Sequence, residues 1–215
     1  MAASKMCAIC GKRKAKRECP GVRGSICAIC CGTEREVSID CPLDCSYLRE
    51  SRRYEAAKVP LGEMPFPDVG VGDSFLTERE HFIGRIAYHL LRYAVENPKT
   101  TDRDVLGAME KLVRTYQTLA SGIYYESLPE EPSQIGLFRD LKTFLDELQE
   151  EERKRQVLGG LKEDDVIRSL VFLSRVAAMH SNQRPRGKAF IDFLRQSYPE
   201  AAAAKQESGL IVPGR

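Results

Sequence analysis

The chain has 215 residues, enough for one ordinary domain and a small additional one, and 42% of them are hydrophobic, so a sizeable core can be buried. Charged residues make up 30%, but the formal net charge is only +2, which excludes polyelectrolyte character over the whole chain. No apolar run approaches the roughly 20 residues that span a membrane, and the first ten residues lack the apolar segment of a secretory signal. We therefore expect a cytoplasmic protein, in a reducing compartment where clustered cysteines bind metal.

The first 45 residues contain all eight cysteines of the chain. Two pairs have the spacing C-x-x-C and a third has C-x-x-x-C, and a pair two residues apart lets a tight turn direct both sulfurs at one ion. Eight thiolates suit two closed tetrahedral zinc sites, which are structural because they leave no open position for catalysis. We therefore predict a module that folds with two zinc ions, its ligands being Cys7, Cys10, Cys19, Cys27, Cys30, Cys31, Cys41 and Cys45.

The spacing leaves open which cysteines share an ion. In a crossed arrangement the two C-x-x-C pairs share one ion, and the second ion takes Cys19, Cys31, Cys41 and Cys45. In a treble-clef pairing the second C-x-x-C pair instead joins Cys41 and Cys45. An iron–sulfur centre is the alternative metal, although the ferredoxin run C-x₂-C-x₂-C-x₃-C-P is absent from the sequence.

The layout of residues 7–45 resembles the two-zinc cross-brace fingers of the HIT, MYND and B-box kinds. It differs from them in three features, which are the lack of a histidine ligand, the lone Cys19, and the Cys30-Cys31 doublet. What the resemblance implies is a zinc-stapled module that interacts with another protein.

Basic residues are concentrated beside the cysteines. Residues 1–58 carry 12 Lys and Arg against 7 Asp and Glu, whereas residues 59–215 carry 21 against 24. Eight thiolates and two Zn²⁺ ions would bring the first segment to a charge of about +1, so part of this basic charge can neutralise the metal sites. The alternative is a nucleic-acid-binding or regulatory protein that contacts phosphates through Lys12, Arg13, Lys14, Lys16, Arg17, Arg49, Arg52 and Arg53.

The module is predicted to occupy residues 1–58 and to end in a helix. Asp40 or Cys41 would cap that helix, Pro42 would fit its first turn, and the Cys41 and Cys45 sulfurs would project from the same turn. Pro20-Gly21 indicates a turn after an exposed hairpin segment. The small apolar core of the module is predicted to contain Ile26, Ile29, Val37 and Ile39.

The remaining chain is predicted to be a Pro- and Gly-rich linker over residues 59–74, a helical bundle over 75–200 and a tail over 201–215. Thr77 with Glu80, and Thr101 with Asp104, have the spacing of capping boxes that open the first two helices. Apolar residues at three- and four-residue spacing continue through a third helix that ends by Gly159-Gly160, a fourth over about 163–180 and a fifth over about 188–198. The predicted fold class is therefore mainly α, with a small cysteine-rich zinc module before an all-α bundle of about five helices that can form two hairpins.

The sequence contains no catalytic triad or phosphate loop, and His81, His89 and His180 are scattered over the predicted helices. We therefore expect a non-enzymatic protein whose zinc module presents a protein-interaction surface on a helical scaffold, which can also form a homodimer. An iron–sulfur redox protein is a further alternative. The sequence does not indicate the partner or the cellular process.

Overall fold

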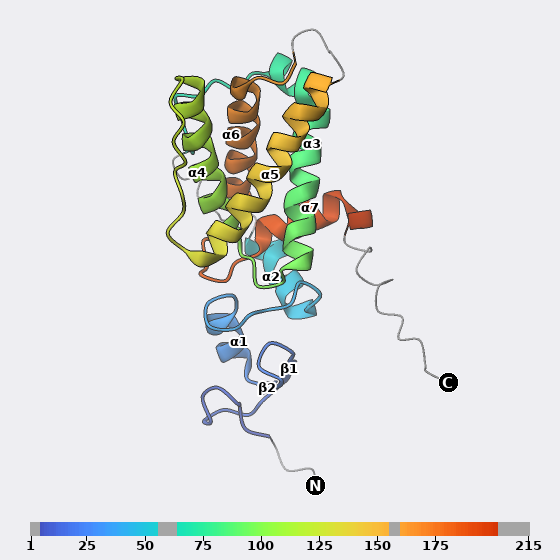
Figure 1. Ribbon diagram of the computed structural model, residues 1–215. Coiled ribbons are helices and arrows are strands. Elements are labelled where there is room, and N and C mark those ends of the chain that lie inside the picture. The colour runs from blue at the N-terminus through green and yellow to red at the C-terminus, as the bar shows by residue number, and fades with distance from the viewer. Residues whose placement is uncertain (1–4, 56–63, 155–159, 202–215) are drawn as a thin grey trace, which may run out of the picture.

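The protein is described by a computed structural model that covers residues 5–55, 64–154 and 160–201. A small cysteine-rich module, residues 5–55, lies at one end of a bundle formed by the later helices (Figure 1). This arrangement confirms the predicted fold class, which is mainly α with a cysteine-rich segment before a helical region. None of the described helices is both long and apolar enough to cross a membrane.

The module is built from two short strands and two helices. Strands β1 (Arg17–Cys19) and β2 (Gly24–Ile26) pair antiparallel, and the turn predicted at Pro20-Gly21 connects them. Helix α1 (Ala28–Glu34) follows, and helix α2 (Ser46–Glu55) lies next to the bundle (Figure 1). Few apolar side chains are buried here besides cysteines, so the module has only a small apolar core of its own.

Two predictions for the module are wrong. Cys41 and Cys45 do not lie in the first turn of a helix, because α2 begins at Ser46 and residues 41–45 form a turn in which the Cys45 amide donates to the Pro42 carbonyl. Ile29 and Val37 are not core residues, with exposed fractions of 55% and 40%. Ile29 is exposed because it lies on the outer side of α1, a helix that the sequence analysis did not predict.

The bundle consists of helices whose apolar faces meet in one core. They are α3 (Asp73–Glu96), α4 (Asp102–Ala120), α5 (Pro132–Lys154), α6 (Glu163–His180) and α7 (Ala189–Ser197). Helix α4 packs against α5 and α6, and α7 packs against α3, α4 and α6. The side chains that the periodic pattern placed inside are buried, among them Leu90, Leu91, Met109, Leu112, Tyr116, Phe138, Leu141, Leu170 and Phe190.

One of the two predicted capping boxes is present. The Thr101 hydroxyl accepts from the Asp104 amide and the Asp104 carboxylate accepts from the Thr101 amide, which opens α4. The box predicted at Thr77 and Glu80 is wrong, because α3 already begins at Asp73 and the Thr77 hydroxyl donates to the Asp73 carbonyl within the helix.

The earlier start of α3 has a cause in the preceding segment. Arg175 on α6 donates to the carbonyls of Pro65, Phe66 and Val69, at distances between 2.6 and 3.1 Å. Phe66, Val69 and Val71 pack against the bundle core. These contacts fix residues 65–71, so the chain enters the helix directly after them. The first part of the predicted linker lies outside the described residues.

A buried glutamate joins the module to the bundle. Glu36 follows α1 with a φ of 53°, is fully buried, and accepts from Arg52 at 2.7 Å. Its carboxylate also accepts from the Asn182 amide group at 2.7 Å and from the backbone N–H of Lys188 at 3.1 Å. Residues 181–188 connect α6 to α7, so one side chain binds both the module and the bundle. These hydrogen bonds compensate for burying the charge and for the left-handed backbone of a glutamate.

Replacing Glu36 by Gln should destabilise the protein strongly, because a neutral amide leaves the Arg52 guanidinium buried without this charge partner. We expect a loss of about 3 kcal/mol in the free energy of unfolding, measured by denaturant titration. The control is Glu110→Gln, which breaks the exposed ion pair with Arg114 and should cost less than about 0.5 kcal/mol. Equal losses in the two variants would contradict the role assigned to Glu36.

Asp102 has a similar position at the start of α4. It is 1% exposed, and its carboxylate accepts from the backbone N–H groups of Phe190 and Ile191, so it caps α7 from another helix. Burial raises the pKa of Asp102 from 3.8 to about 6, against the opposing effect of these hydrogen bonds. Between pH 4 and pH 6 the folded protein therefore binds a proton that the unfolded chain releases, and this group favours folding less as the pH rises.

The Asp102→Asn variant replaces the ionisable carboxyl group by an amide that does not titrate. We expect the stability of the wild type, relative to the variant, to fall by up to about 3 kcal/mol between pH 4 and pH 7. The measurement is the free energy of unfolding of both proteins at the two pH values. Parallel pH profiles would show that Asp102 titrates at its ordinary value.

Candidate metal centre

Four cysteines from two loops meet at one point of the module. The Sγ atoms of Cys7, Cys10, Cys27 and Cys30 all lie within 4.8 Å of one another. In a tetrahedral zinc–thiolate site the sulfurs are about 3.8 Å apart, given Zn–S bonds of about 2.3 Å. Only a small contraction separates the described arrangement from that geometry, so these four side chains could hold a metal ion.

The backbone around the first pair explains how its sulfurs are positioned. The Gly11 amide donates to the Cys7 carbonyl at 2.8 Å, which closes a tight turn around the C-x-x-C pair. Gly11 has a φ of 61°, a conformation that a residue without Cβ adopts at little cost. The Ala8 amide donates to the Ser25 carbonyl at 3.0 Å and thereby joins this turn to β2, which leads directly into the second pair.

The second pair is positioned by a helix. Cys27 is the N-cap of α1, and its sulfur accepts from the Cys30 backbone N–H at 3.4 Å. The helix then returns the Cys30 side chain toward the same point. Both pairs have the sequence Cys-Ala-Ile-Cys, so the centre is made from two similar loops that face one another.

Backbone N–H groups and neighbouring sulfurs shift the acidity of this centre in opposite directions. The Cys10 amide lowers the pKa of Cys7 to about 6, whereas the hydrogen bond with Cys27 raises the pKa of Cys30 to about 12. The Cys27 sulfur also raises the pKa of the Arg13 guanidinium. Four thiolates at this point would lack enough positive charge around them, and a bound cation would allow all four to ionise.

The other four cysteines are among the residues beside a second, small cavity. Cys19, Cys31, Cys41 and Cys45 all line one enclosed cavity of about 10 Å³. Their sulfurs do not form a group as tight as the first one. Burial raises the pKa of Cys41 to about 11, and the buried Arg35 donates from Nη2 to the Cys31 sulfur at 3.9 Å.

The structure brings together the first of the two groups in the crossed arrangement. The Cys27 and Cys30 sulfurs meet those of the first C-x-x-C pair, and Cys41 and Cys45 do not belong to that group. Cys31, adjacent to Cys30, instead lines the second cavity.

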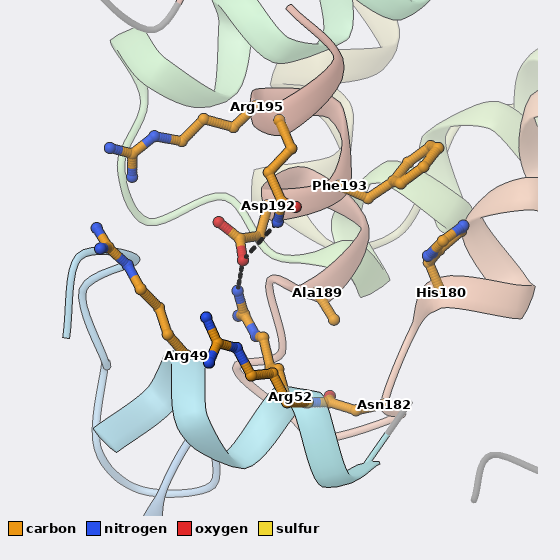
Figure 2. A pocket seen from close by; sticks show the side chains of 10 residues that line it. Arg49, Arg52, His180, Asn182, Ala189, Asp192, Phe193 and Arg195 are labelled. Atoms are coloured by element: carbon orange, nitrogen blue, oxygen red, sulfur yellow. Dashed lines mark hydrogen bonds and ion pairs between the residues drawn. The ribbon is translucent and has the colours of Figure 1, made fainter. Parts of the chain in front are cut away.

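The predicted basic residues do not form one patch. Lys12, Arg13, Lys14 and Lys16 are exposed around the first turn and the hairpin. Arg17 lies over the Tyr47 ring, 4.4 Å from its centre. Arg49, Arg52 and Arg53 instead line a pocket between α2 and the bundle, to which none of the residues from Lys12 to Arg17 contributes (Figure 2).

The three histidines have separate surroundings. His81 is exposed, His89 lies 2.6 Å from an Asp140 carboxylate oxygen, and His180 stacks on Phe193. His180 lines the pocket together with Asn182, Asp192 and Arg195. Sequence reasoning missed this grouping, because more than 120 residues separate these side chains from α2 and no local pattern links them.

Comparisons of the chain with protein-family models, with curated proteins and with solved structures gave no match.

Cys30→Ser tests the first centre, because a hydroxyl is a poor zinc ligand beside three thiolates. We expect the purified variant to hold one metal equivalent less per chain than the wild type, by elemental analysis. Its remaining thiols should also react faster with a thiol reagent. The control is Ala28→Ser, an exposed position in the same turn that should keep the full metal content. A Cys30→Ser protein with wild-type metal content would contradict this assignment.

Proposed function

We propose that the protein is a non-enzymatic zinc-binding protein, in which two structural zinc ions hold the module and the module presents a surface to a partner protein. The observation that carries the proposal is the convergence of four cysteine sulfurs within 4.8 Å. All-thiolate ligation leaves no open position at such a site, so the metal acts by shaping the module.

The second ion is proposed for the cavity between Cys19, Cys31, Cys41 and Cys45. A cavity of about 10 Å³ suits one small ion and little else. A site of four thiolates and one Zn²⁺ has a net charge of −2, and the buried Arg35 beside Cys31 favours that charge. Zinc is favoured over iron–sulfur because the two proposed sites would each be closed by four thiolates at the spacing of zinc fingers.

The proposed partner surface lies around the first centre. Ile9 and Ile29 occupy the same position in the two Cys-Ala-Ile-Cys turns, and they are 39% and 55% exposed. Met6 and Val37 are also exposed, at 53% and 40%. These four apolar side chains are exposed to solvent and are not part of the small core of the module. Exposed apolar groups on a rigid surface favour interaction with another protein. Glu36 holds this surface in a fixed position on the bundle.

The resemblance to cross-brace fingers supports the same proposal. The crossed division of the cysteines is the arrangement that such fingers use, and they act as protein-interaction modules. The helical bundle would then serve as scaffold or dimerisation unit.

Affinity capture with the zinc-loaded protein tests the partner surface. The Ile9→Ser/Ile29→Ser double variant should lose the captured partner while it keeps its metal, because both side chains are exposed and neither contributes to the buried core. Leu128→Ser is the control, since Leu128 is 46% exposed and lies outside the module. Capture that is equally strong with the double variant would contradict the assignment of this surface.

A further inference from the structure

A pocket of about 580 Å³ lies where the module meets the bundle. In Figure 2, Arg49 and Arg52 extend from α2 on one side of the pocket. Asp192 and Arg195 extend from α7 on the other side. The end of α6 contributes His180. The pocket exists because Glu36 and Arg52 hold the module against the bundle, so neither part could form it alone.

The charge of this pocket is strongly positive. Four guanidinium groups line it, against the single carboxylate of Asp192. Arg52 already uses that carboxylate, with Nη1 at 2.6 Å from Asp192 Oδ2. Arg49 donates to the Leu43 carbonyl at 3.4 Å, and Arg49, Arg53 and Arg195 have no carboxylate partner within the described ranges. The guanidinium groups of these three arginines are therefore left to bind an anion. The paired N–H donors of a guanidinium group match the spacing of the oxygens of a phosphate.

One wall of the pocket is aromatic. The rings of His180 and Phe193 stack with their centres 3.9 Å apart and their planes at 19°. His180 is nevertheless an exposed residue and lines the pocket, so a ligand in the pocket can reach its imidazole. Partial burial lowers the pKa of His180, which favours the neutral ring. In Figure 2 the two rings lie on one side of Asp192, and the Arg49 and Arg195 guanidiniums lie on the other.

We propose that this pocket binds a nucleotide unit, with the base stacked on the His180–Phe193 wall and the phosphate on Arg49, Arg53 and Arg195. A flat aromatic wall beside several guanidiniums suits a ligand with a planar ring and a phosphate, and base stacking on aromatic side chains is sequence-tolerant. The carboxylates of an acidic peptide would bind the arginines, but such a peptide would have no planar ring to stack on the aromatic wall. The volume suits one such unit, free or in a single strand. This inference goes beyond the proposed function, since the pocket lies away from the first centre.

The test uses the full-length, zinc-loaded protein at low salt. One arm measures fluorescence anisotropy with labelled single-stranded 12-mers of RNA and DNA, and the other measures calorimetric binding of ATP and of inorganic phosphate. A strand that binds much more tightly than ATP identifies a nucleic-acid ligand, and similar affinities identify a free nucleotide; either result supports the pocket as a nucleotide site. No binding of any strand or nucleotide at low salt would overturn the proposal.

Substitutions inside and outside the pocket test whether the ligand binds there. Arg195→Glu and Arg53→Glu should each weaken binding about tenfold or more, because each reverses one of the charges that contact phosphate. Arg139→Glu makes the same charge change on an exposed face of α5 and should have little effect. His180→Ala should also weaken nucleotide binding about tenfold but leave the affinity for inorganic phosphate unchanged.

The remaining outcomes contradict the proposal. If Arg139→Glu weakened binding as much as Arg195→Glu, binding would depend on the overall surface charge and not on this pocket. A glutamate 12-mer peptide that binds as tightly as the strands, with no effect of His180→Ala, would identify an acidic peptide as the ligand. Metal content is measured for every variant, so loss of the zinc sites is distinguishable from loss of the pocket.

Discussion

The convergence of four cysteine sulfurs at one point is the constraint on which the module depends. The Sγ atoms of Cys7, Cys10, Cys27 and Cys30 lie within 4.8 Å of one another, and four thiolates at this distance would repel one another. A divalent cation removes that conflict and converts the same four groups into strong ligands. The module buries few apolar side chains besides its cysteines, so under the proposed function metal binding and the folding of residues 5–55 are one event.

The ordered module in turn determines how the two parts of the chain are joined. Glu36 follows α1 with a left-handed backbone conformation, and its side chain is buried in the interface with the bundle. There Arg52 is shared between Glu36 on the module and Asp192 on α7. The pocket between α2 and α7 therefore depends on how the module is held against the bundle. Under the proposed function, the structural ions would support this pocket without contacting it.

The sequence allowed the bundle helices and the cysteine ligands to be predicted, but not the interface between the module and the bundle. Periodic apolar residues gave the bundle helices closely, including α6 at Glu163–His180, because the spacing reports directly on the buried face. Cysteine spacing indicated metal ligands, since a C-x-x-C turn determines local geometry, but it left open which cysteines share an ion. The start of α3 was misplaced because tertiary contacts of Arg175 override a local capping pattern. The Glu36 interface and the arginine pocket could not be predicted, because they join residues at least 140 positions apart through tertiary contacts.

Elemental analysis of the purified wild-type protein, with an absorption spectrum of the same sample, tests the central claim most directly. The account predicts two zinc ions per chain and a colourless solution, because eight cysteines form two closed thiolate sites. Iron with visible absorption would contradict the structural role and favour a redox protein. A folded protein with eight reactive thiols and no metal would contradict the account of residues 7–45 altogether.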